Sequence, residues 1–359
     1  MLLLQHSLAY GVLSFAKAWG YLRHAEQHCE ALAVPHIDPQ ANREGMIIRS
    51  VSQFICGAIG LASSLLPSSI GGLANLLMGI PADRDLAVLR LEYCWQERGL
   101  LASWACAVAL AYHVDIRFFL GEDVSSQDIG RCHQMLSWAL ERHPNSILFG
   151  LLKANLAGLE YRDDEALWWI DKCAGYIPEA PALGLVVHAQ HAKFAPVSHR
   201  WSLAAIAFER AAAVNIGVGR RSMVPFFLFS SALCYMQAGD LPAAQSSLKT
   251  VTSYEAIGNK NWHPADRRSL SKTRAYNNIA GGIANLGKLP PLLDLIELLE
   301  LKLHALRRMS PDRLVALLDQ INAETHISSV PSVEARRLRY GAELTRLLGE
   351  RCTGRHVQT

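Results

Sequence analysis

Apolar and polar positions follow helical spacing along most of the chain, and the pattern is clearest at positions 145–178. The first half of this segment carries leucines about one turn apart, at Leu148, Leu151, Leu152 and Leu156. The second half follows an acidic cluster and carries Ala166, Ile170 and Cys173 before Pro178. Spacings of three and four place residues on one face of a helix. The segment therefore predicts two short helices in a hairpin, and the small side chains of Ala154 and Ala166 would let them approach closely.

The hairpin pattern recurs with a period of 34 residues. One copy has Cys132, Leu136, Ala139 and Pro144, and the next has Ala166, Ile170, Cys173 and Pro178, each shifted by 34 positions. Later copies have looser spacing and are marked by Ala204, Phe208 and Ala211, and then by Ala232, Tyr235, Ala244, Leu248 and Val251. A 34-residue helical hairpin is the tetratricopeptide unit, which cannot bury its apolar face alone and must stack. We therefore expect an all-α, tetratricopeptide-like helical-hairpin solenoid.

The remaining segments also predict helices, and none shows the alternation of a strand. These helices are expected at about 2–33, from 42 onwards, 83–97, 100–119, 264–287, 291–306, 311–323 and 332–350. Gly121 should close the helix at 100–119, and Ser125 or Ser126 should cap the next one, whose apolar face runs from Cys132 to His143. We divide the chain into an N-terminal helical region (1–122), repeats (123–290) and C-terminal helices (291–359). We expect one continuous right-handed fold, with the N-terminal helices packed on the repeats.

Positions 50–82 contain no charged residue. A transmembrane helix needs about 20 consecutive apolar residues, and here Pro67 and the Gly71-Gly72 pair divide the run. We expect two buried or interfacial helices, with reversible contact at a lipid surface as the alternative to burial. The first residues lack the basic start of a signal peptide, so we expect a buried first helix there.

Composition narrows the function further. Of 359 residues, 50% are apolar and 19% are charged, which is typical of a globular protein. The formal net charge of +3 gives no reason to expect a nucleic-acid partner. The eight cysteines form no CxxC pair, which favours a reducing, cytoplasmic location.

The sequence predicts no metal site, cofactor or catalytic group. His24 and His28 lie one turn apart, as do His188 and His191, but neither pair has further ligands at metal-binding spacing. The Gly217-Val218-Gly219 turn with Arg220 and Arg221 lacks a preceding strand, so we interpret it as a loop between repeats. No Ser/His/Asp or Cys/His signature is present.

The concave face of the repeats predicts the binding residues. In tetratricopeptide stacks, four positions of each first helix line this face. In one repeat they are Phe226, Phe229, Leu233 and Met236, and in an earlier one Leu148, Leu151, Asn155 and Gly158. Such a groove is apolar. Either the N-terminal helices of the chain fill it, or it forms a cavity for an apolar small molecule or lipid.

Several blocks resemble the inclusion-body clearance and tetratricopeptide-repeat-39 family. They are SLLPSSIGGLANLLMGIPADRDL (64–86), LAYHVDIRFFLG (110–121), RHPNSILF (142–149), YRDDEAL (161–167) and FSSALCYMQAGDLPAAQSSL (229–248). The family usually has Gly-Asp-Arg where this chain has Ala82-Asp83-Arg84. The resemblance implies an all-helical scaffold without a common catalytic set. It also implies links to lipid droplets, sterol-related regulation and aggregate clearance.

Two functions follow as hypotheses. The first is a helical-repeat scaffold that binds a protein partner or an apolar ligand, with lipid-droplet or peripheral membrane contact as an extension. The alternative is an apolar pocket that folds a hydrophobic substrate for cofactor-free, pericyclase-like cyclisation, since such a step depends mainly on shape and orientation. Under either hypothesis, further candidate ligand-binding residues beyond the groove positions are Trp104, Tyr112 and Tyr235. His188 is a candidate polar anchor. The oligomeric state stays open.

Overall fold

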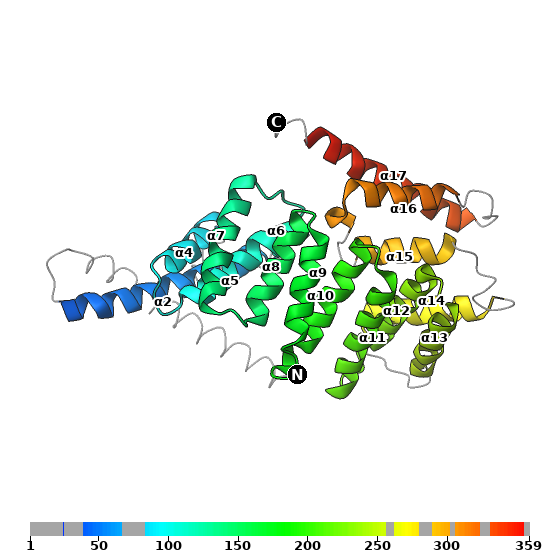
Figure 1. Cartoon of the computed structure of the whole chain (residues 1–359), viewed down its shortest axis with the longest axis horizontal. Coiled ribbons are helices and arrows are strands. Elements are labelled where there is room, and N and C mark those ends of the chain that lie inside the picture. The colour runs from blue at the N-terminus through cyan, green and yellow to red at the C-terminus, as the bar shows by residue number, and fades with distance from the viewer. Residues whose placement is uncertain are drawn as a thin grey trace, which may run out of the picture. The chain divides into compact units, whose positions relative to one another are not determined.

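The computed structural model describes residues 24, 39–66, 83–255, 262–279, 289–301, 306–323 and 331–354. Every regular element in these ranges is a helix, so the predicted all-α fold is confirmed for the described part of the chain. The chain forms two compact units, residues 1–144 (unit 1) and 145–359 (unit 2) (Figure 1). The predicted boundary at 122 falls inside unit 1. The expectation that the N-terminal helices pack on the repeats stays a prediction.

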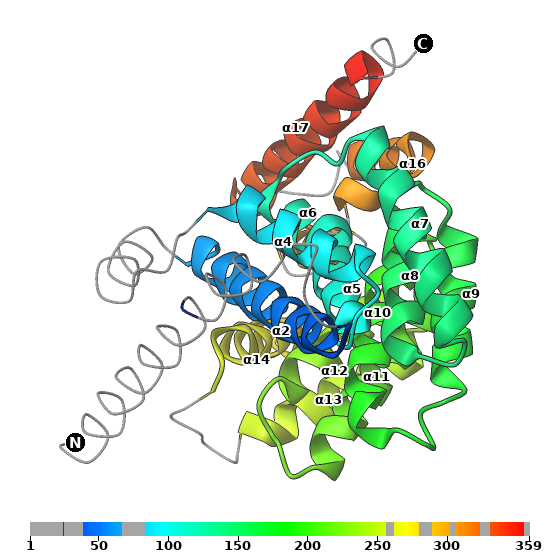
Figure 2. The same cartoon turned by 90° about the vertical axis from the view of Figure 1, so that its left-hand side faces the viewer.

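Unit 1 is built on the long helix α2 (Pro39–Ser64). It packs along α4 (Arg84–Gln96) and also contacts α5 (Ala102–Ala111) (Figure 2). A close approach of α2 and α4 requires Gly57, because a Cβ atom there would lie 2.8 Å from Cγ of Leu91. Leu91 and Cys94 of α4 and Cys106 of α5 are fully buried in this core.

The helix predicted at 100–119 contains a turn of π-helix. After α5 the chain continues as a π-helix at Tyr112–Ile116 and then as α6 (Arg117–Leu120). It ends at Gly121, whose φ of 76° is left-handed and suits glycine. Ser125 then caps α7 (Ser126–Arg142) in a capping box with Asp128. The predicted stop and start of these helices are therefore confirmed.

The uncharged run at positions 50–82 begins inside α2. By length and composition alone, Gly45–Ser64 is long and apolar enough to cross a membrane, and 33% of its most apolar window is buried. No other helix in the described residues meets that criterion. The second predicted piece of the run, at 67–82, lies outside the described residues, as does the helix predicted at 2–33 apart from His24.

Unit 2 begins with the predicted hairpin, formed by α8 (Ile147–Leu159) and α9 (Asp163–Ala174). Two more helical pairs follow: α10 (Gly184–Val197) with α11 (Trp201–Gly217), and α12 (Val224–Ala238) with α13 (Leu241–Glu255). Each pair contacts the next through α9 with α10 and α11 with α12. Ala166 is fully buried in this core. The tetratricopeptide-like arrangement is thus confirmed.

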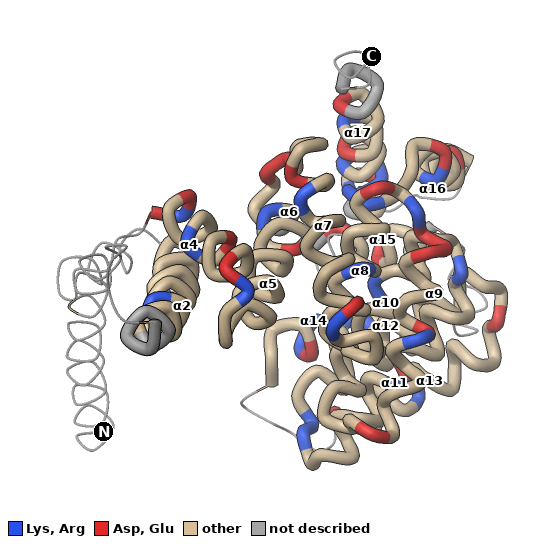
Figure 3. The backbone as a smooth tube through the Cα atoms, turned by 60° about the vertical axis from the view of Figure 1, so that its left-hand side comes forward, with Lys and Arg blue, Asp and Glu red and all other residues tan. Residues whose placement is uncertain are grey.

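Four C-terminal helices complete unit 2, and two of them pack against the last repeat. They are α14 (Pro264–Asn277), α15 (Leu289–Leu301), α16 (Pro311–Ala323) and α17 (Pro331–Gly354), with a short 3₁₀ turn at Leu306–Arg308. Both α14 and α15 contact α12, and α16 pairs with α17. The apolar helix α12, which carries no charged residue (Figure 3), is therefore covered by helices of its own unit.

Candidate functional site

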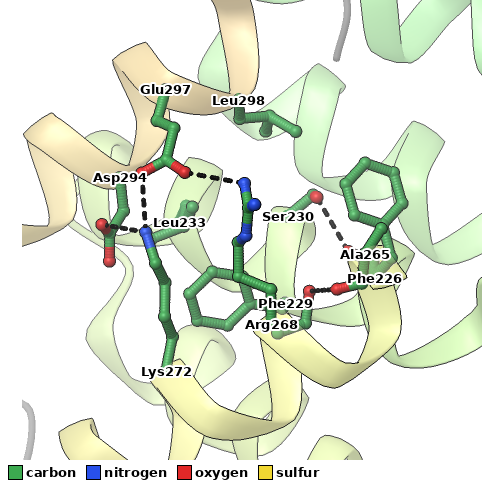
Figure 4. A pocket seen from close by; sticks show the side chains of 11 residues that line it. Phe226, Phe229, Ser230, Leu233, Ala265, Arg268, Lys272, Asp294, Glu297 and Leu298 are labelled. Atoms are coloured by element: carbon green, nitrogen blue, oxygen red, sulfur yellow. Dashed lines mark hydrogen bonds and ion pairs between the residues drawn. The ribbon is translucent and has the colours of Figure 1, made fainter. Parts of the chain in front are cut away.

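The predicted groove residues of the last repeat lie on the buried side of α12. Phe226, Phe229 and Leu233 are all buried, and they line a cavity of about 40 Å³ beneath α14 and α15 (Figure 4). A cavity of this size holds a few water molecules at most. Their role in binding an apolar ligand stays a prediction that this small cavity does not support.

The opposite wall of this cavity is charged. Lys272 Nζ of α14 lies 2.5 Å from Asp294 Oδ1 and 2.9 Å from Glu297 Oε2, both on α15. Arg268 pairs with Glu297 at 3.0 Å. Figure 4 shows the Lys272 ammonium between the two carboxylates. Ion pairs thus join α14 to α15 over the apolar face of α12.

The other predicted residues of the repeats are dispersed. Tyr235 donates its hydroxyl to Glu209 at 3.2 Å, and burial together with Glu209 raises the pKa of Tyr235 to about 12. Met236 is half-buried against the core. His188 is buried in α10, where burial, Arg210 and His191 lower its pKa. These side chains therefore do not form one constellation with the α12 cavity, whose lining includes none of them.

The earlier repeat is occupied by arginines from the C-terminal segment. Leu148 is exposed and Leu151 is buried. The carbonyl oxygen of buried Asn155 accepts a hydrogen bond from Arg308 Nη1 at 3.0 Å, and its Oδ1 accepts one from Lys193 at 3.3 Å. Arg308 is itself 1% exposed.

A second arginine of this segment binds at the end of the same repeats. Arg313 pairs with Asp163 and donates to the Val197 carbonyl oxygen at 2.5 Å. Burial raises the pKa of Asp163 to about 6, and Arg313 opposes that shift. The sequence pattern gave no sign of these contacts, because their partners lie more than 100 positions apart.

A pocket in unit 1 has a mostly polar lining. It has a volume of about 490 Å³ and is formed by α4, the π-helix, α6 and α7. Tyr112, a binding residue predicted from the sequence, lines this pocket. Its role in binding stays a prediction. We call this pocket the α4 pocket, and its lining residues are Arg84, Asp85, Val88, Leu89, Glu92, Tyr112, His113, Arg117, Glu122, Asp128 and Arg131.

Each arginine of the α4 pocket is paired with a carboxylate. Arg84 pairs with Glu122, and Arg117 Nη1 lies 2.8 Å from Asp128. A third pair joins Arg131 Nη1 to Glu92 at 2.8 Å.

The buried carboxylate of Glu92 also contacts His113 Nε2 at 3.1 Å. Burial alone would raise the pKa of Glu92, but the hydrogen bonds from His113 and Arg131 hold it below its usual value. This π-helical turn thus supplies two side chains, Tyr112 and His113, to one pocket, and π-helical turns often occur at functional sites.

An exposed apolar stripe borders the α4 pocket. Leu86, Leu89 and Tyr93 lie about one turn apart on α4 and are 38%, 44% and 50% exposed. Leu89 also lines the pocket. Large apolar side chains grouped on one exposed face are typical of interaction surfaces. We call these three residues the α4 stripe.

Trp104 lies elsewhere in unit 1, at the start of α5, and is 60% exposed.

No group of three or more His, Cys, Asp or Glu side chains suited to a metal ion occurs in the described residues. Sequence reasoning missed the α4 pocket as a site, although Arg84 and Asp85 stand in one of the blocks that carry the family resemblance. Pairing between distant arginines and carboxylates leaves no periodic signal.

Comparison with known proteins agrees with the fold. The model of the family "Iml2/Tetratricopeptide repeat protein 39" matches residues 8–256. A relative, the inclusion body clearance protein IML2 of Schizosaccharomyces pombe (strain 972), is 24% identical over 282 residues, covering 72% of this chain and 47% of the relative. The chain therefore spans about half the length of that relative. No solved structure matches significantly. Because the family model covers most of the chain, this protein belongs to the Iml2/tetratricopeptide repeat protein 39 family.

Proposed function

We propose that this helical-repeat scaffold holds a segment of a protein partner on the α4 stripe and in the adjacent α4 pocket. The observation that carries the proposal is the contact between the two features at Leu89, which belongs to both. An apolar centre with a charged, partly solvated rim is the usual anatomy of a protein–protein interface. Tyrosine and arginine, both present here, are enriched among the residues that dominate binding energy.

The geometry favours an amphipathic helix as the bound segment. The α4 stripe runs for two helical turns, about 10 Å at 1.5 Å per residue. A partner helix meets such a stripe with apolar residues at matching spacing. Asp85 lines the pocket and pairs with no described side chain, whereas the three pocket arginines are already paired. The partner helix should therefore place a basic residue beside Asp85.

Similarity to the S. pombe protein, which is named for inclusion body clearance, suggests the cellular setting. We propose that the partner takes part in such clearance. An apolar ligand, a lipid surface and a cyclisation remain predictions from sequence. The cavity on α12, at about 40 Å³, does not support the last of these because a folded hydrophobic substrate needs several hundred cubic ångströms.

Site-specific photocrosslinking tests the proposal. A photoreactive phenylalanine analogue at Leu89 should crosslink one reproducible partner in cells that express the protein. The same analogue at Leu338, an exposed leucine of α17, serves as the matched control. Leu89→Asp in the purified protein should then weaken binding of the identified partner at least tenfold. Equal crosslinking at both positions, or unchanged binding by Leu89→Asp, would refute the proposal.

A further inference from the structure

A second arrangement in unit 1 places arginine side chains on indole rings. The guanidinium carbon of Arg98 lies 4.6 Å from the ring centroid of Trp95 and 4.4 Å from that of Trp138. Arg142 lies 5.1 Å from the same Trp138 ring. Two cations therefore share one half-buried tryptophan at the end of α7. Stacking on an aromatic face fixes a guanidinium while leaving its N–H donors at the ring edge available.

Neither arginine forms an ion pair with a described carboxylate. Nearby acidic side chains have other contacts: Glu97 pairs with Arg49 at 3.0 Å, and Glu141 accepts a hydrogen bond from Ser137 at 3.4 Å. This differs from the α4 pocket, where each arginine has a carboxylate partner. Arg98 and Arg142 are both exposed, so their N–H groups can donate hydrogen bonds to an external carboxylate.

The loop between α4 and α5 holds this arrangement in place and adds apolar surface. Arg98 has a left-handed φ of 55°, an uncommon conformation for a residue other than glycine. A Cβ atom on Gly99 would lie 2.8 Å from Ser50 Oγ, so the loop packs closely on α2. Backbone strain of this kind persists only where the surroundings determine it, and it often marks functional positions.

Two large apolar side chains project from the same region. Leu100 is 74% exposed and Trp104 is 60% exposed. A hydrogen bond of 2.9 Å between Ser103 Oγ and His143 Nε2 joins the start of α5 to the end of α7. This bond brings Trp104 to the end of the unit that carries Arg142. Exposed tryptophan beside arginine is the composition of interface hot spots.

We infer that these residues form a docking surface for an acidic segment of a protein partner. The surface consists of Arg98, Leu100, Trp104, Trp138 and Arg142, and we call it the Arg98 patch. Carboxylates of the segment would accept paired hydrogen bonds from Arg98 and Arg142. A neighbouring aliphatic or aromatic side chain of the segment would cover Leu100 and Trp104. The patch shares no residue with the α4 pocket or the α4 stripe, so this inference is independent of the proposed function.

Peptide selection tests the chemistry of the partner directly. A random 12-residue peptide library is displayed on phage and selected on the full chain. Enriched peptides should combine at least two Asp or Glu residues with an aromatic or aliphatic residue. The best peptide, synthesised and labelled, should bind at least tenfold more weakly to the double variant Arg98→Gln/Arg142→Gln. Its affinity should also fall as NaCl rises from 50 to 300 mM, because salt screens exposed charges.

Two controls separate recognition from loss of structure. Arg220→Gln/Arg221→Gln removes two exposed charges from a loop of unit 2 and should leave the affinity within twofold. Arg98→Lys/Arg142→Lys keeps both charges and should retain more binding than the glutamine pair. Each variant's melting temperature is measured alongside. Enrichment of peptides without acidic residues would overturn the inference, as would equal binding by the folded Arg98→Gln/Arg142→Gln variant.

Discussion

Replacing Asp294 should release α17 and loosen α14. The contacts of its carboxylate allow the loss of stability to be estimated. The buried carboxylate of Asp294 accepts hydrogen bonds from Lys272, Arg336 and the Tyr276 hydroxyl. The two cations also contact Glu297, at 2.9 and 3.1 Å, so Asp294→Ala does not leave them unpaired. Both are partly exposed, and each lost pair should cost no more than about 1 kcal/mol.

The larger loss comes from Tyr276. Its hydroxyl is buried, and the loss of its hydrogen-bond acceptor should lower the free energy of unfolding by about 1–3 kcal/mol. The total expected for Asp294→Ala is therefore about 1–5 kcal/mol of local stability. Asp294→Asn keeps an acceptor oxygen for the hydroxyl, so it should cost about half as much. Tyr276→Phe combined with Asp294→Ala should be less destabilising than the sum of the two single changes, because they remove the same bond.

Hydrogen exchange measured by mass spectrometry suits this prediction, because a chain with two units need not unfold in one step. Peptides from α14 and α17 should exchange about 5- to 4,000-fold faster in Asp294→Ala, at 1.4 kcal/mol per tenfold change. Peptides from unit 1 serve as the internal control. Exchange in α14 and α17 within twofold of the unmodified protein would refute the reasoning.

Three further predictions concern other parts of the chain. The pKa of Asp163 is about 6 in the folded state and about 3.8 in the unfolded state. Between pH 3.8 and 6 the Asp163 carboxyl group is therefore more protonated in the folded state than in the unfolded state. Stability relative to Asp163→Asn should then fall by up to about 3 kcal/mol from pH 4 to 6, and a rise in urea titrations would show that Arg313 dominates. Ala166→Trp should destabilise the protein by about 1–3 kcal/mol or more through overpacking of a fully buried position, and an unchanged melting temperature would contradict the repeat register. If the exposed Met46 and Ile48 of α2 contact lipid, the protein should float with liposomes in a density gradient. The variant Met46→Glu/Ile48→Glu should then lose this flotation. Recovery of the unmodified protein entirely in the liposome-free fraction would exclude interfacial contact.

The helical hairpins could be predicted because local spacing determines them. Ala166, Ile170 and Cys173 lie on one face of α9, and all three are buried. Ser125 and Gly121 begin and end helices through contacts within a few residues, so their roles also follow from sequence. The π-helical turn at Tyr112–Ile116 was not predicted, since the sequence predicts one regular helix at positions 100–119.

The candidate sites could not be predicted in the same way, because distant residues build them. Glu92 and Arg131 belong to different helices and meet only in the folded unit. Arg308 lies 153 positions from Asn155, whose carbonyl oxygen it binds. No helical or repeat period relates such pairs. Tyr112 was selected from sequence as an aromatic side chain near an apolar groove, whereas the structure places it in a charged pocket.

The apolar character of the repeat face explains why unit 2 covers it. Exposing Phe226, Phe229 and Leu233 together would leave a continuous apolar patch, which favours aggregation. The C-terminal helices α14 and α15 bury these residues, and ion pairs among Lys272, Asp294 and Glu297 then hold those helices together. An apolar groove read from sequence is therefore equally consistent with a binding site and with an internal packing surface. Exposure decides between them: the α4 stripe keeps 38–50% of each side chain in solvent, so this surface, unlike the covered face of α12, retains apolar area for a partner to bury.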